Sequence, residues 1–172
     1  MRKVLIATLS SGVLMAAAGT AVAATATNTF NVTATVNKNC LVSGANLDFG
    51  AYTPGGGART ANSAITVRCT KTTPYTVSLN AGTSVGGTLA QRLLANGANT
   101  LQYNLYTTAG LATIWGDGTG GTGTIGGTGN GVSVVSAQTL TVYGQLPDNT
   151  TNQDVVPAAG SFADQITVTV TY

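Results

Sequence analysis

The residues of this chain that could do chemistry are few, and the types that catalysis uses most are missing. The sequence contains no His, and its acidic residues are Asp only. General acid–base catalysis near neutral pH needs His or paired carboxylates with shifted pKa values. A serine nucleophile would need a base, and neither Lys38 nor Lys71 stands in an S-x-x-K arrangement. The sequence therefore predicts no enzyme, no metal site and no cofactor, although two Asp could still meet in the fold; the five are Asp48, Asp117, Asp148, Asp154 and Asp164.

A glycine-rich stretch, Gly116–Gly131, formally matches two ligand-binding patterns. Gly116-x-Gly118-x-x-Gly121 has the spacing of a dinucleotide-binding loop, but the pattern works only between a strand and a helix, and no helix is expected after it. The stretch also resembles half of a calcium-binding nonapeptide repeat, without the Asp that would supply ligand oxygens. We therefore interpret it as a flexible surface loop.

Aromatic side chains are the remaining candidates for a binding site. Tyr103, Tyr106, Trp115 and Tyr143 could form a platform on which a sugar stacks. Aromatic residues in alternating strands more often belong to the core of a β-sandwich. The sequence leaves both readings open and favours the core.

The N-terminus has the parts of a secretory signal peptide. Met1-Arg2-Lys3 is followed by an apolar run, Val4–Val22, and then by small residues. We expect cleavage after Ala23, within one residue. A membrane anchor is the competing interpretation, but the run contains Thr, Ser and Gly and no basic cluster follows it. We expect no integral membrane segment in the remaining chain.

Removal of residues 1–23 changes the charge of the protein. The whole chain carries a net charge of +2, whereas five basic residues then remain against five Asp, which gives zero. Nucleic acids and anionic membranes bind clustered Lys and Arg, so neither is an expected partner. A sparsely charged surface favours association with other proteins.

The two cysteines are expected to form one disulfide. Cys40 and Cys69 lie in a chain that is exported, hence in an oxidising compartment. The bond would close a loop of about 30 residues and contribute roughly 3–4 kcal/mol to stability.

The chain that remains after cleavage reads as strands and turns. Thr, Val, Gly, Asn and Ala dominate, and apolar residues alternate with polar ones. Only Thr88–Ala95 looks weakly helical. The predicted strands are Phe30–Val36, Ile65–Cys69, Tyr75–Leu79, Leu101–Tyr106, Leu111–Trp115, Leu140–Gly144 and Ile166–Tyr172, with a weaker one at Leu47–Tyr52. About seven short strands separated by Gly, Pro and Asn clusters predict an all-β fold, an immunoglobulin-like β-sandwich.

The two ends of the mature chain look complementary. An immunoglobulin-like sandwich usually ends with two paired strands. If Ile166–Tyr172 is the first of these, the sandwich is incomplete, lacks its last strand, and exposes core residues and unpaired backbone in a groove. Such a groove needs a partner, and another chain can supply it by adding a donor strand.

An ordered set of segments resembles the spore coat protein U domain family, which includes the subunits of archaic, Csu-type chaperone–usher pili. The segments are F-N-V-T-A-T-V-N-K-N-C (Phe30–Cys40), L-D-F-G-A-Y (Leu47–Tyr52), I-T-V-R-C (Ile65–Cys69) and F-A-D-Q-I-T-V-T-V-T-Y (Phe162–Tyr172). The resemblance covers nearly all of the mature chain. The glycine-rich stretch Gly116–Gly131 looks like an addition to the family pattern.

The resemblance implies a structural pilus subunit that is exported through the periplasm to the cell surface and supports adhesion and biofilm formation. Its partners would be a periplasmic chaperone, an outer-membrane usher and identical or related subunits in a polymer. It also implies a signal peptide (1–23), a donor segment (24–36) and a pilin domain (37–172). The donor side chains would be Phe30, Val32, Ala34 and Val36, and the acceptor groove or chaperone-binding edge would include Ile166, Val168, Val170 and Tyr172.

Three alternatives remain open at this stage. Phe30–Val36 could be the first strand of its own domain, with the donor confined to Ala24–Thr29. The chain could be a secreted adhesin or carbohydrate-binding module. The name of the family also suggests a coat protein of a resistant cell.

Overall fold

The structure is a computed structural model that describes residues 22–154 and 159–172. The expected signal peptide therefore lies almost entirely outside the described residues. The chain divides into two units, Met1–Thr35 and Val36–Tyr172, and the second unit holds the strands. Among the described residues, none of the helices is long and apolar enough to cross a membrane.

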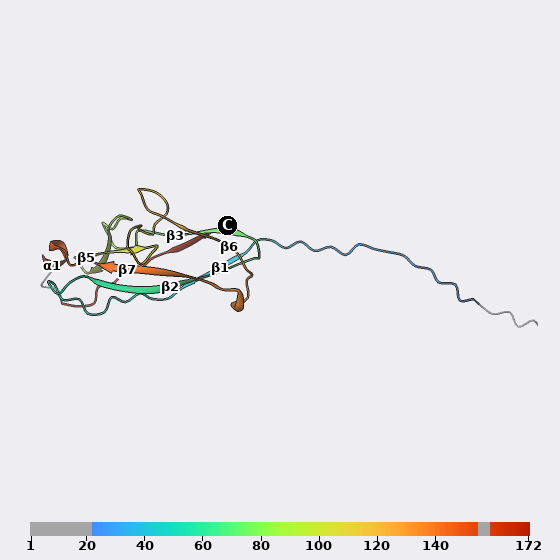
Figure 1. The fold of residues 1–172 in the computed structure, drawn as a ribbon, viewed down its shortest axis with the longest axis horizontal. Helices are drawn as coiled ribbons and strands as arrows, with labels where there is room; N and C mark the ends of the chain where they lie inside the picture. Colours follow the sequence, from blue (N-terminus) through green and yellow to red (C-terminus); the bar gives the residue numbers. More distant parts are fainter. Residues whose placement is uncertain (1–21, 155–158) are drawn as a thin grey trace, which may run out of the picture. The chain divides into compact units, whose positions relative to one another are not determined.

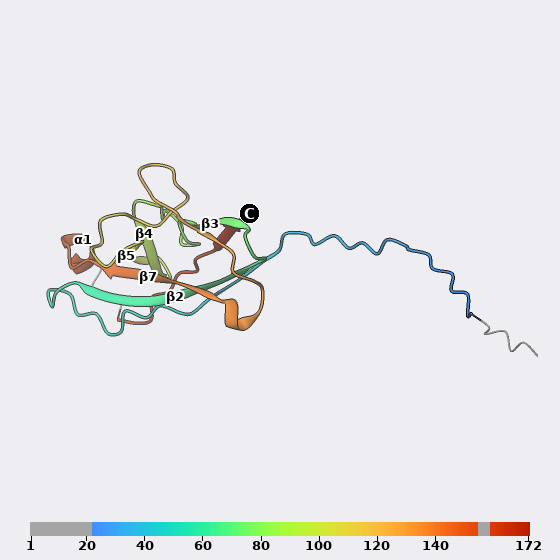
Figure 2. The ribbon, with the colours of Figure 1, turned by 45° about the vertical axis from the view of Figure 1, so that its right-hand side comes forward.

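The second unit is a β-sandwich with immunoglobulin-like character. Antiparallel strands form a five-stranded sheet in the order β1-β2-β7-β5-β4 and a three-stranded sheet in the order β6-β3-β8. Figures 1 and 2 show the long strands β2 and β7 side by side, with β3 across from them. The strands are β1 (Cys40–Gly44), β2 (Arg59–Cys69), β3 (Pro74–Leu79), β4 (Arg92–Asn96), β5 (Asn99–Tyr106), β6 (Ile125–Thr128), β7 (Gln138–Leu146) and β8 (Val168–Thr171).

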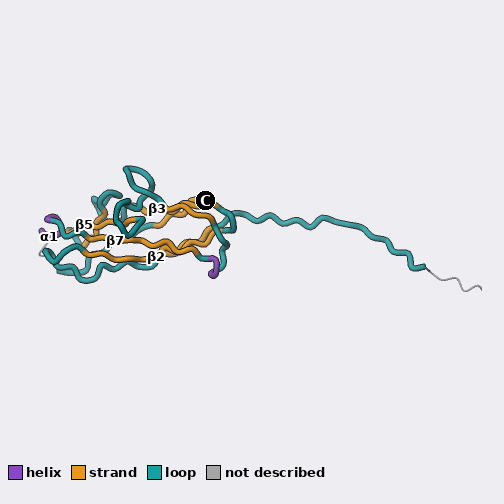
Figure 3. The backbone as a smooth tube through the Cα atoms, in the orientation of Figure 1, coloured by secondary structure: helices purple, strands orange, loops and turns teal. Residues whose placement is uncertain are grey.

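Two short helices complete the described structure. The 3-10 helix η1 (Val134–Ser136) precedes β7, and the helix α1 (Thr150–Asp154) follows it. Figure 3 shows η1 at the end of the sandwich where β1 begins, and α1 at the opposite end. Turns and loops connect the remaining strands.

Strand periodicity predicts the centre of the fold correctly. β2, β3, β5, β7 and β8 all contain or overlap the segments expected to be strands. Leu111–Trp115 contacts β5 through an isolated bridge between Tyr106 and Ile114 and a 2.8 Å hydrogen bond from Trp115 N to Leu105 O. In each of these strands, alternation places the apolar side chains of one face against the core, and the core packs against that face.

Five expectations about local structure were wrong. Leu111–Trp115 is not a strand, because only Ile114 and Trp115 form bridges and these are isolated. Thr88–Ala95 is not helical, because its second half forms β4 on β5. Phe30–Val36 and Leu47–Tyr52 are not strands, since no neighbouring strand pairs with them among the described residues. Gly116–Gly131 is not simply a surface loop, because it contains β6, which pairs with β3.

The core lies between the two sheets and is built from the inward side chains of both. Val67, Val77 and Trp115 are fully buried in it. Tyr103 is buried as well, so two of the four candidate aromatic residues belong to the core, which is the interpretation that the sequence favours. Tyr106 and Tyr143 are half-buried and lie opposite each other on β5 and β7.

A buried arginine holds the place where β5 changes partners. β5 pairs with β4 along its first half and with β7 from Asn104 onward. Arg92 is 0% exposed and donates to the carbonyl oxygens of Asn80 (2.9 and 2.7 Å) and Trp115 (2.7 Å) and to Oδ1 of Asn104 (2.6 Å). The guanidinium therefore satisfies backbone that the irregular pairing would leave without donors.

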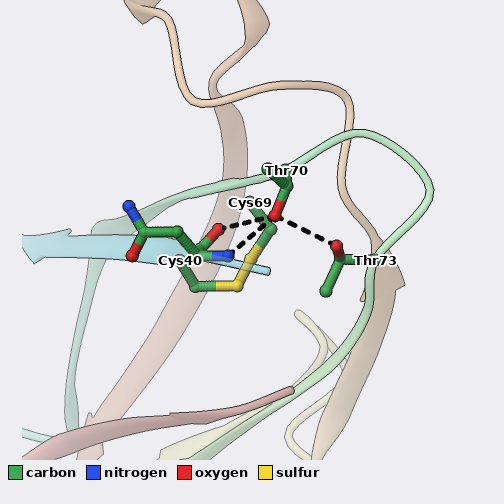
Figure 4. Close-up of a disulfide and its surroundings, with 5 residues drawn as sticks. Cys40, Cys69, Thr70 and Thr73 are labelled. Carbon is green, nitrogen blue, oxygen red and sulfur yellow. Dashed lines mark hydrogen bonds between the residues drawn. A yellow bond between two sulfur atoms is a disulfide. The ribbon is translucent and has the colours of Figure 1, made fainter. Parts of the chain in front are cut away.

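The disulfide expected from the sequence is present. Cys40, the first residue of β1, bonds to Cys69, the last residue of β2, with 4.1 Å between the Cα atoms. Figure 4 shows Thr70 beside it, which accepts from Asn39 N (2.8 Å) and from the hydroxyl of Thr73 (3.1 Å). These bonds fix the point at which the chain enters the sandwich.

Replacing Arg92 by Met should destabilise the fold strongly. The substitution keeps much of the volume but leaves the buried carbonyl oxygens of Asn80 and Trp115 without a donor, and Oδ1 of Asn104 keeps only the bond from Leu105 N. Each such oxygen costs about 1–3 kcal/mol, so the free energy of unfolding should fall by about 3 kcal/mol or more. Urea denaturation measures it. Arg59→Met, at an exposed position of β2, is the control and should change stability by less than about 0.5 kcal/mol. Equal losses in the two variants would contradict this account.

Candidate functional site

The most prominent feature of the sandwich is an open groove that reaches the apolar side chains of its core. The groove has a volume of about 1400 Å³ and is lined by side chains from both sheets. A cavity of about 150 Å³ already accommodates benzene, so this groove has room for several apolar side chains. Its apolar lining residues in strands are Ile65, Leu79, Leu94, Leu101, Tyr103, Leu105, Val142, Leu146 and Val168.

Two strand edges accompany the groove. Within the described chain, β1 pairs only with β2, and β8 pairs only with β3. Each strand therefore has a second edge whose backbone N–H and C=O groups lack a strand partner. The two strands belong to different sheets and approach each other across the sandwich. Together with the groove, these edges form a site for an added strand.

One wall of the groove is the irregular segment that follows β1. The hydroxyl of Ser63 donates to the carbonyl oxygens of Ala45 (2.7 Å) and Asn46 (3.1 Å), which holds the segment against β2. A Cβ at Gly144 would approach Leu47 to 2.9 Å and the Phe49 ring to 3.0 Å. The absent side chain of Gly144 thus makes room for the apolar residues of this wall.

A carboxylate closes the end of the same wall. Asp148 accepts hydrogen bonds from the hydroxyl of Tyr52 (2.6 Å) and from the backbone N–H groups of Gly55 (3.0 Å) and Gly57 (2.7 Å). These three donors lower the pKa of Asp148 to about 2. Burial and the bond to Asp148 raise the pKa of Tyr52 to about 12. The pair ties the loop before β2 to the turn after β7.

A second carboxylate positions the opposite wall, the segment that leads into β8. Asp164 accepts from the hydroxyl of Tyr103 (2.7 Å) and from the backbone N–H groups of Thr83 (2.8 Å) and Ser84 (3.1 Å). Burial would raise its pKa, but these donors, Tyr103 first, hold the pKa below its usual value. Burial and Asp164 raise the pKa of Tyr103 in turn. Asp164 therefore fixes the segment that leads into β8 to Tyr103 of β5 and to the loop that contains Thr83 and Ser84.

Further bonds align the residues between Asp164 and β8. Oδ1 of Asn80 accepts from Thr167 N (2.9 Å), while Asn80 N donates to Thr167 O (3.2 Å). Ala163 exchanges backbone hydrogen bonds of 2.8 and 3.0 Å with Ala95 of β4. With its neighbours held in this way, Ile166 lies between two fixed points and lines the groove.

The residues expected to form the acceptor edge occupy different environments. Ile166 and Val168 line the groove and pack against the core. Val170 is half-buried against the core, and Tyr172 is 52% exposed. That these residues contact a partner stays a prediction.

The residues expected to form the donor segment are all exposed. Phe30, Val32 and Val36 are 85%, 84% and 83% exposed, and Ala34 is exposed as well. No strand or helix is present in residues 22–39. The alternation of apolar residues in this segment therefore has no partner in the described structure.

Comparison with known proteins identifies the family. The family model described as Spore Coat Protein U domain matches residues 26–169. The chain belongs to this family. A structural relative of this Spore Coat Protein U domain is a chain in the crystal structure of the CsuC–CsuE chaperone–tip adhesion subunit pre-assembly complex, from the archaic chaperone–usher Csu pili of Acinetobacter baumannii. The TM-score is 0.55 at 25% identity, over 80% of this chain and 40% of the other. A search of curated proteins returned no match.

Three Asp side chains of this Spore Coat Protein U domain hold local segments of the fold in place. Asp148 and Asp164 each organise a wall of the groove, and Asp117 accepts from its own neighbour Thr119 (2.6 and 2.8 Å). No cluster suited to a metal ion exists among the described residues.

Three residues that line the groove were not predicted from the sequence. Leu47, Phe49 and Phe162 line it, although none of them was expected there. The alternation of Leu47 and Phe49 was a usable signal, because it predicts one apolar face. Nothing local showed that this face would cover an open core instead of pairing in a sheet.

Removing the Asp148 carboxylate should cost stability in a pH-dependent way. A carboxyl group with a depressed folded-state pKa stabilises the fold above its ordinary pKa, and the contribution is lost as the pH falls toward the folded value. The melting temperature of Asp148→Ala should therefore be lower than that of the wild type near neutral pH, and the difference should shrink between about pH 4 and pH 2. Thermal melts across this range measure it. Asp154→Ala, at an exposed position of α1, should show no such convergence, and a constant difference for Asp148→Ala would contradict the assignment.

Proposed function

We propose that this protein is a structural subunit of a chaperone–usher surface pilus that polymerises by donor-strand complementation. Phe30, Val32, Ala34 and Val36 of one subunit fill the groove of the next. The chain is exported through the periplasm, held there by a chaperone and assembled by an outer-membrane usher. The fibre then supports adhesion and biofilm formation at the cell surface.

The groove carries this proposal. A groove of about 1400 Å³ that reaches the apolar core side chains, with two unpaired strand edges beside it, offers both side-chain burial and backbone hydrogen bonds to an extended segment. The chain itself contains a segment of matching chemistry, whose alternating apolar residues are exposed. Burying each large side chain contributes roughly 1.5–3 kcal/mol, and a new ladder adds to it.

The direction of pairing differs between a donor within the chain and a donor from another chain. Within one chain, Phe30–Val36 could fold back onto β1 through Asn37–Asn39, as an antiparallel hairpin. Because β1 and β8 run in opposite directions, that hairpin strand would lie parallel to β8, and parallel pairs are the less stable kind. A donor from another chain can run antiparallel to β8, in which case it lies parallel to β1, so each direction leaves one parallel pair.

The structural relative supports the assignment of partners. It comes from a complex of a pilus subunit with its chaperone, and this chain aligns with 40% of that chain's length. A groove that can accept a donor strand can also accept a strand lent by a chaperone, because the backbone chemistry is the same. We therefore include the chaperone and the usher in the proposal.

A charge introduced into the donor segment should abolish polymerisation. Val32→Asp would place a carboxylate in the apolar groove, where an unpaired charge is strongly unfavourable. Thr33→Asp is the matched control, because alternate residues of an extended segment face opposite sides. With the chaperone and usher coexpressed, electron microscopy should show fibres for Thr33→Asp and none for Val32→Asp. Neither position lies in a strand, so both variants should fold. Fibres of normal length from Val32→Asp would refute the donor assignment.

A copy of residues 24–36 fused after Tyr172 should give a stable monomer. The fused segment can turn back beside β8 and fill the groove of its own chain. Burial of Phe30, Val32 and Val36 should raise stability by roughly 5 kcal/mol, and the melting temperature by at least about 10 °C. Calorimetry and size-exclusion chromatography measure these effects.

The fusion also tests the acceptor side. Val168→Asn, on the groove face of β8, should remove much of the gain, whereas Thr169→Asn, exposed on the other face, should preserve it. Equal gains in the two variants would place the added segment elsewhere.

Immunogold labelling on a cell coat instead of on fibres would favour the coat-protein alternative.

A further inference from the structure

A turn outside the groove exposes two adjacent apolar side chains. Val134 and Val135 form most of η1 between β6 and β7, and they are 76% and 92% exposed. Val132, just before the turn, is 40% exposed. Isolated apolar residues on a surface are common, whereas contiguous exposed apolar side chains mark interaction surfaces.

The turn is held rigidly enough to present these valines. Ser136 N donates to Ser133 O (3.1 Å), and the two serine hydroxyls lie 3.0 Å apart. Gly131 N donates to Cys69 O (2.8 Å), which ties the start of the turn to the end of β2. The polar groups thus bond within the turn, and the valine side chains are left facing solvent.

The turn lies where the chain enters the sandwich. We call this end the entry pole and define it by Asn39, Cys69–Thr73 and Gly131–Gln138; Figure 3 shows η1 there. Cys69 is joined to Cys40 with 4.1 Å between their Cα atoms, and Thr70 N donates to Asn39 O (2.8 Å). The start of the valine turn and the entering chain are therefore both bonded to the end of β2.

A short linker limits how far this pole can be from a neighbouring subunit. If Val36 occupies the groove of another copy, only Asn37–Asn39 connect it to Cys40. Extended chain spans at most about 3.6 Å per residue, so the two Cα atoms lie within roughly 14 Å of each other. At this distance the exposed turn at the entry pole meets the surface of the neighbour.

The geometry of β8 indicates which surface that is. β8 runs toward the entry pole, because Thr171 pairs with Thr76 near the start of β3, and Figure 1 marks the C-terminus at that end. A donor strand antiparallel to β8 leaves the groove at the opposite end. We call this end the far pole, defined by Gly55–Arg59 and Leu146–Asp154. The entry pole of one copy thus faces the far pole of the next.

The charges at the two poles are complementary. Lys38 and Lys71 are exposed at the entry pole, and Arg68 is half-buried beside them. Asp148 and Asp154 lie at the far pole, together with Arg59. In a protein with so few charges, this distribution favours an arrangement of copies from head to tail.

We infer that the valine turn at the entry pole is a second contact between subunits, which docks on the far pole of the neighbour that receives the donor strand. This inference rests on the proposed function, because it requires the donor strand in a neighbouring groove. It adds a contact that donor-strand pairing alone does not supply. The occupant of the surface is a second copy of this chain.

Cysteine labelling in assembled fibres tests this contact. Val135→Cys and the control Ala109→Cys, exposed in the loop after β5, are each reacted with a maleimide without reductant, so that the Cys40–Cys69 disulfide stays intact. Each variant is compared as a self-complemented monomer, as a chaperone complex and as a fibre. Labelling of Val135→Cys should be at least about tenfold slower in the fibre than in the monomer, as expected for an interface that opens rarely. Labelling of Ala109→Cys should not change.

Each other outcome contradicts the inference in a distinguishable way. If fibres form and Val135→Cys reacts as fast as in the monomer, the donor strand is the only contact and the proposed function stands alone. If protection occurs in the chaperone complex and is lost in the fibre, the occupant is the chaperone. Equal protection of Ala109→Cys in the fibre would indicate general burial instead of a specific contact. If no fibres form from the wild-type chain, the proposed function and this inference both fail.

Discussion

Two sheets that share an apolar interior exclude water only where side chains or another strand cover the gap between their edges. In this protein β1 and β8 approach each other across the sandwich, and within the described chain neither has a strand on its second edge. The core therefore remains open as a groove of about 1400 Å³. The apolar side chains of the walls are stabilised when another apolar side chain covers them, and the unpaired backbone of β1 and β8 is stabilised by hydrogen bonds to another strand. An extended segment with alternating apolar side chains supplies both.

An open core must keep its shape without internal packing to support it. Here a few polar side chains hold the walls in place, and one of them, Asp164, itself lines the groove. Asp148 fixes the segment around Tyr52, Asp164 fixes the segment before β8, and Arg92 fixes the irregular pairing of β5. Each of them bonds to backbone, which makes the walls insensitive to side-chain motion. The sequence contains few charged residues, and these three hold segments of the fold together through hydrogen bonds.

The same geometry links the two proposed contacts of a fibre. The disulfide and Thr70 fix the entering chain beside the valine turn, so a subunit that donates its N-terminal segment also brings this turn to its neighbour. A donor strand alone would leave a joint that bends at Asn37–Asn39. A second contact at the joint would limit this bending, and opposite charges at the two poles would orient the subunits before they dock.

The sequence by itself determined the strands of the core, the disulfide and the family. Alternation in Ile65–Cys69, Tyr75–Leu79 and Leu140–Gly144 is a local property, and each of these segments found the buried face that it predicts. The two cysteines allowed one intramolecular bond. The segments that carry the family resemblance lie within or beside the region that the family model matches.

Only the tertiary structure decided which alternating segments become strands, because a strand also needs a neighbour that lies far away in the sequence. Leu47–Tyr52 has the pattern but no ladder, and it became a wall of the groove. Thr88–Ala95 looked weakly helical, yet its second half pairs with β5 in a sheet, where Arg92 is buried and hydrogen-bonded. Phe30–Val36 has the clearest alternation outside the core and no partner among the described residues. Periodicity is encoded residue by residue, whereas the partner that satisfies it depends on the whole fold.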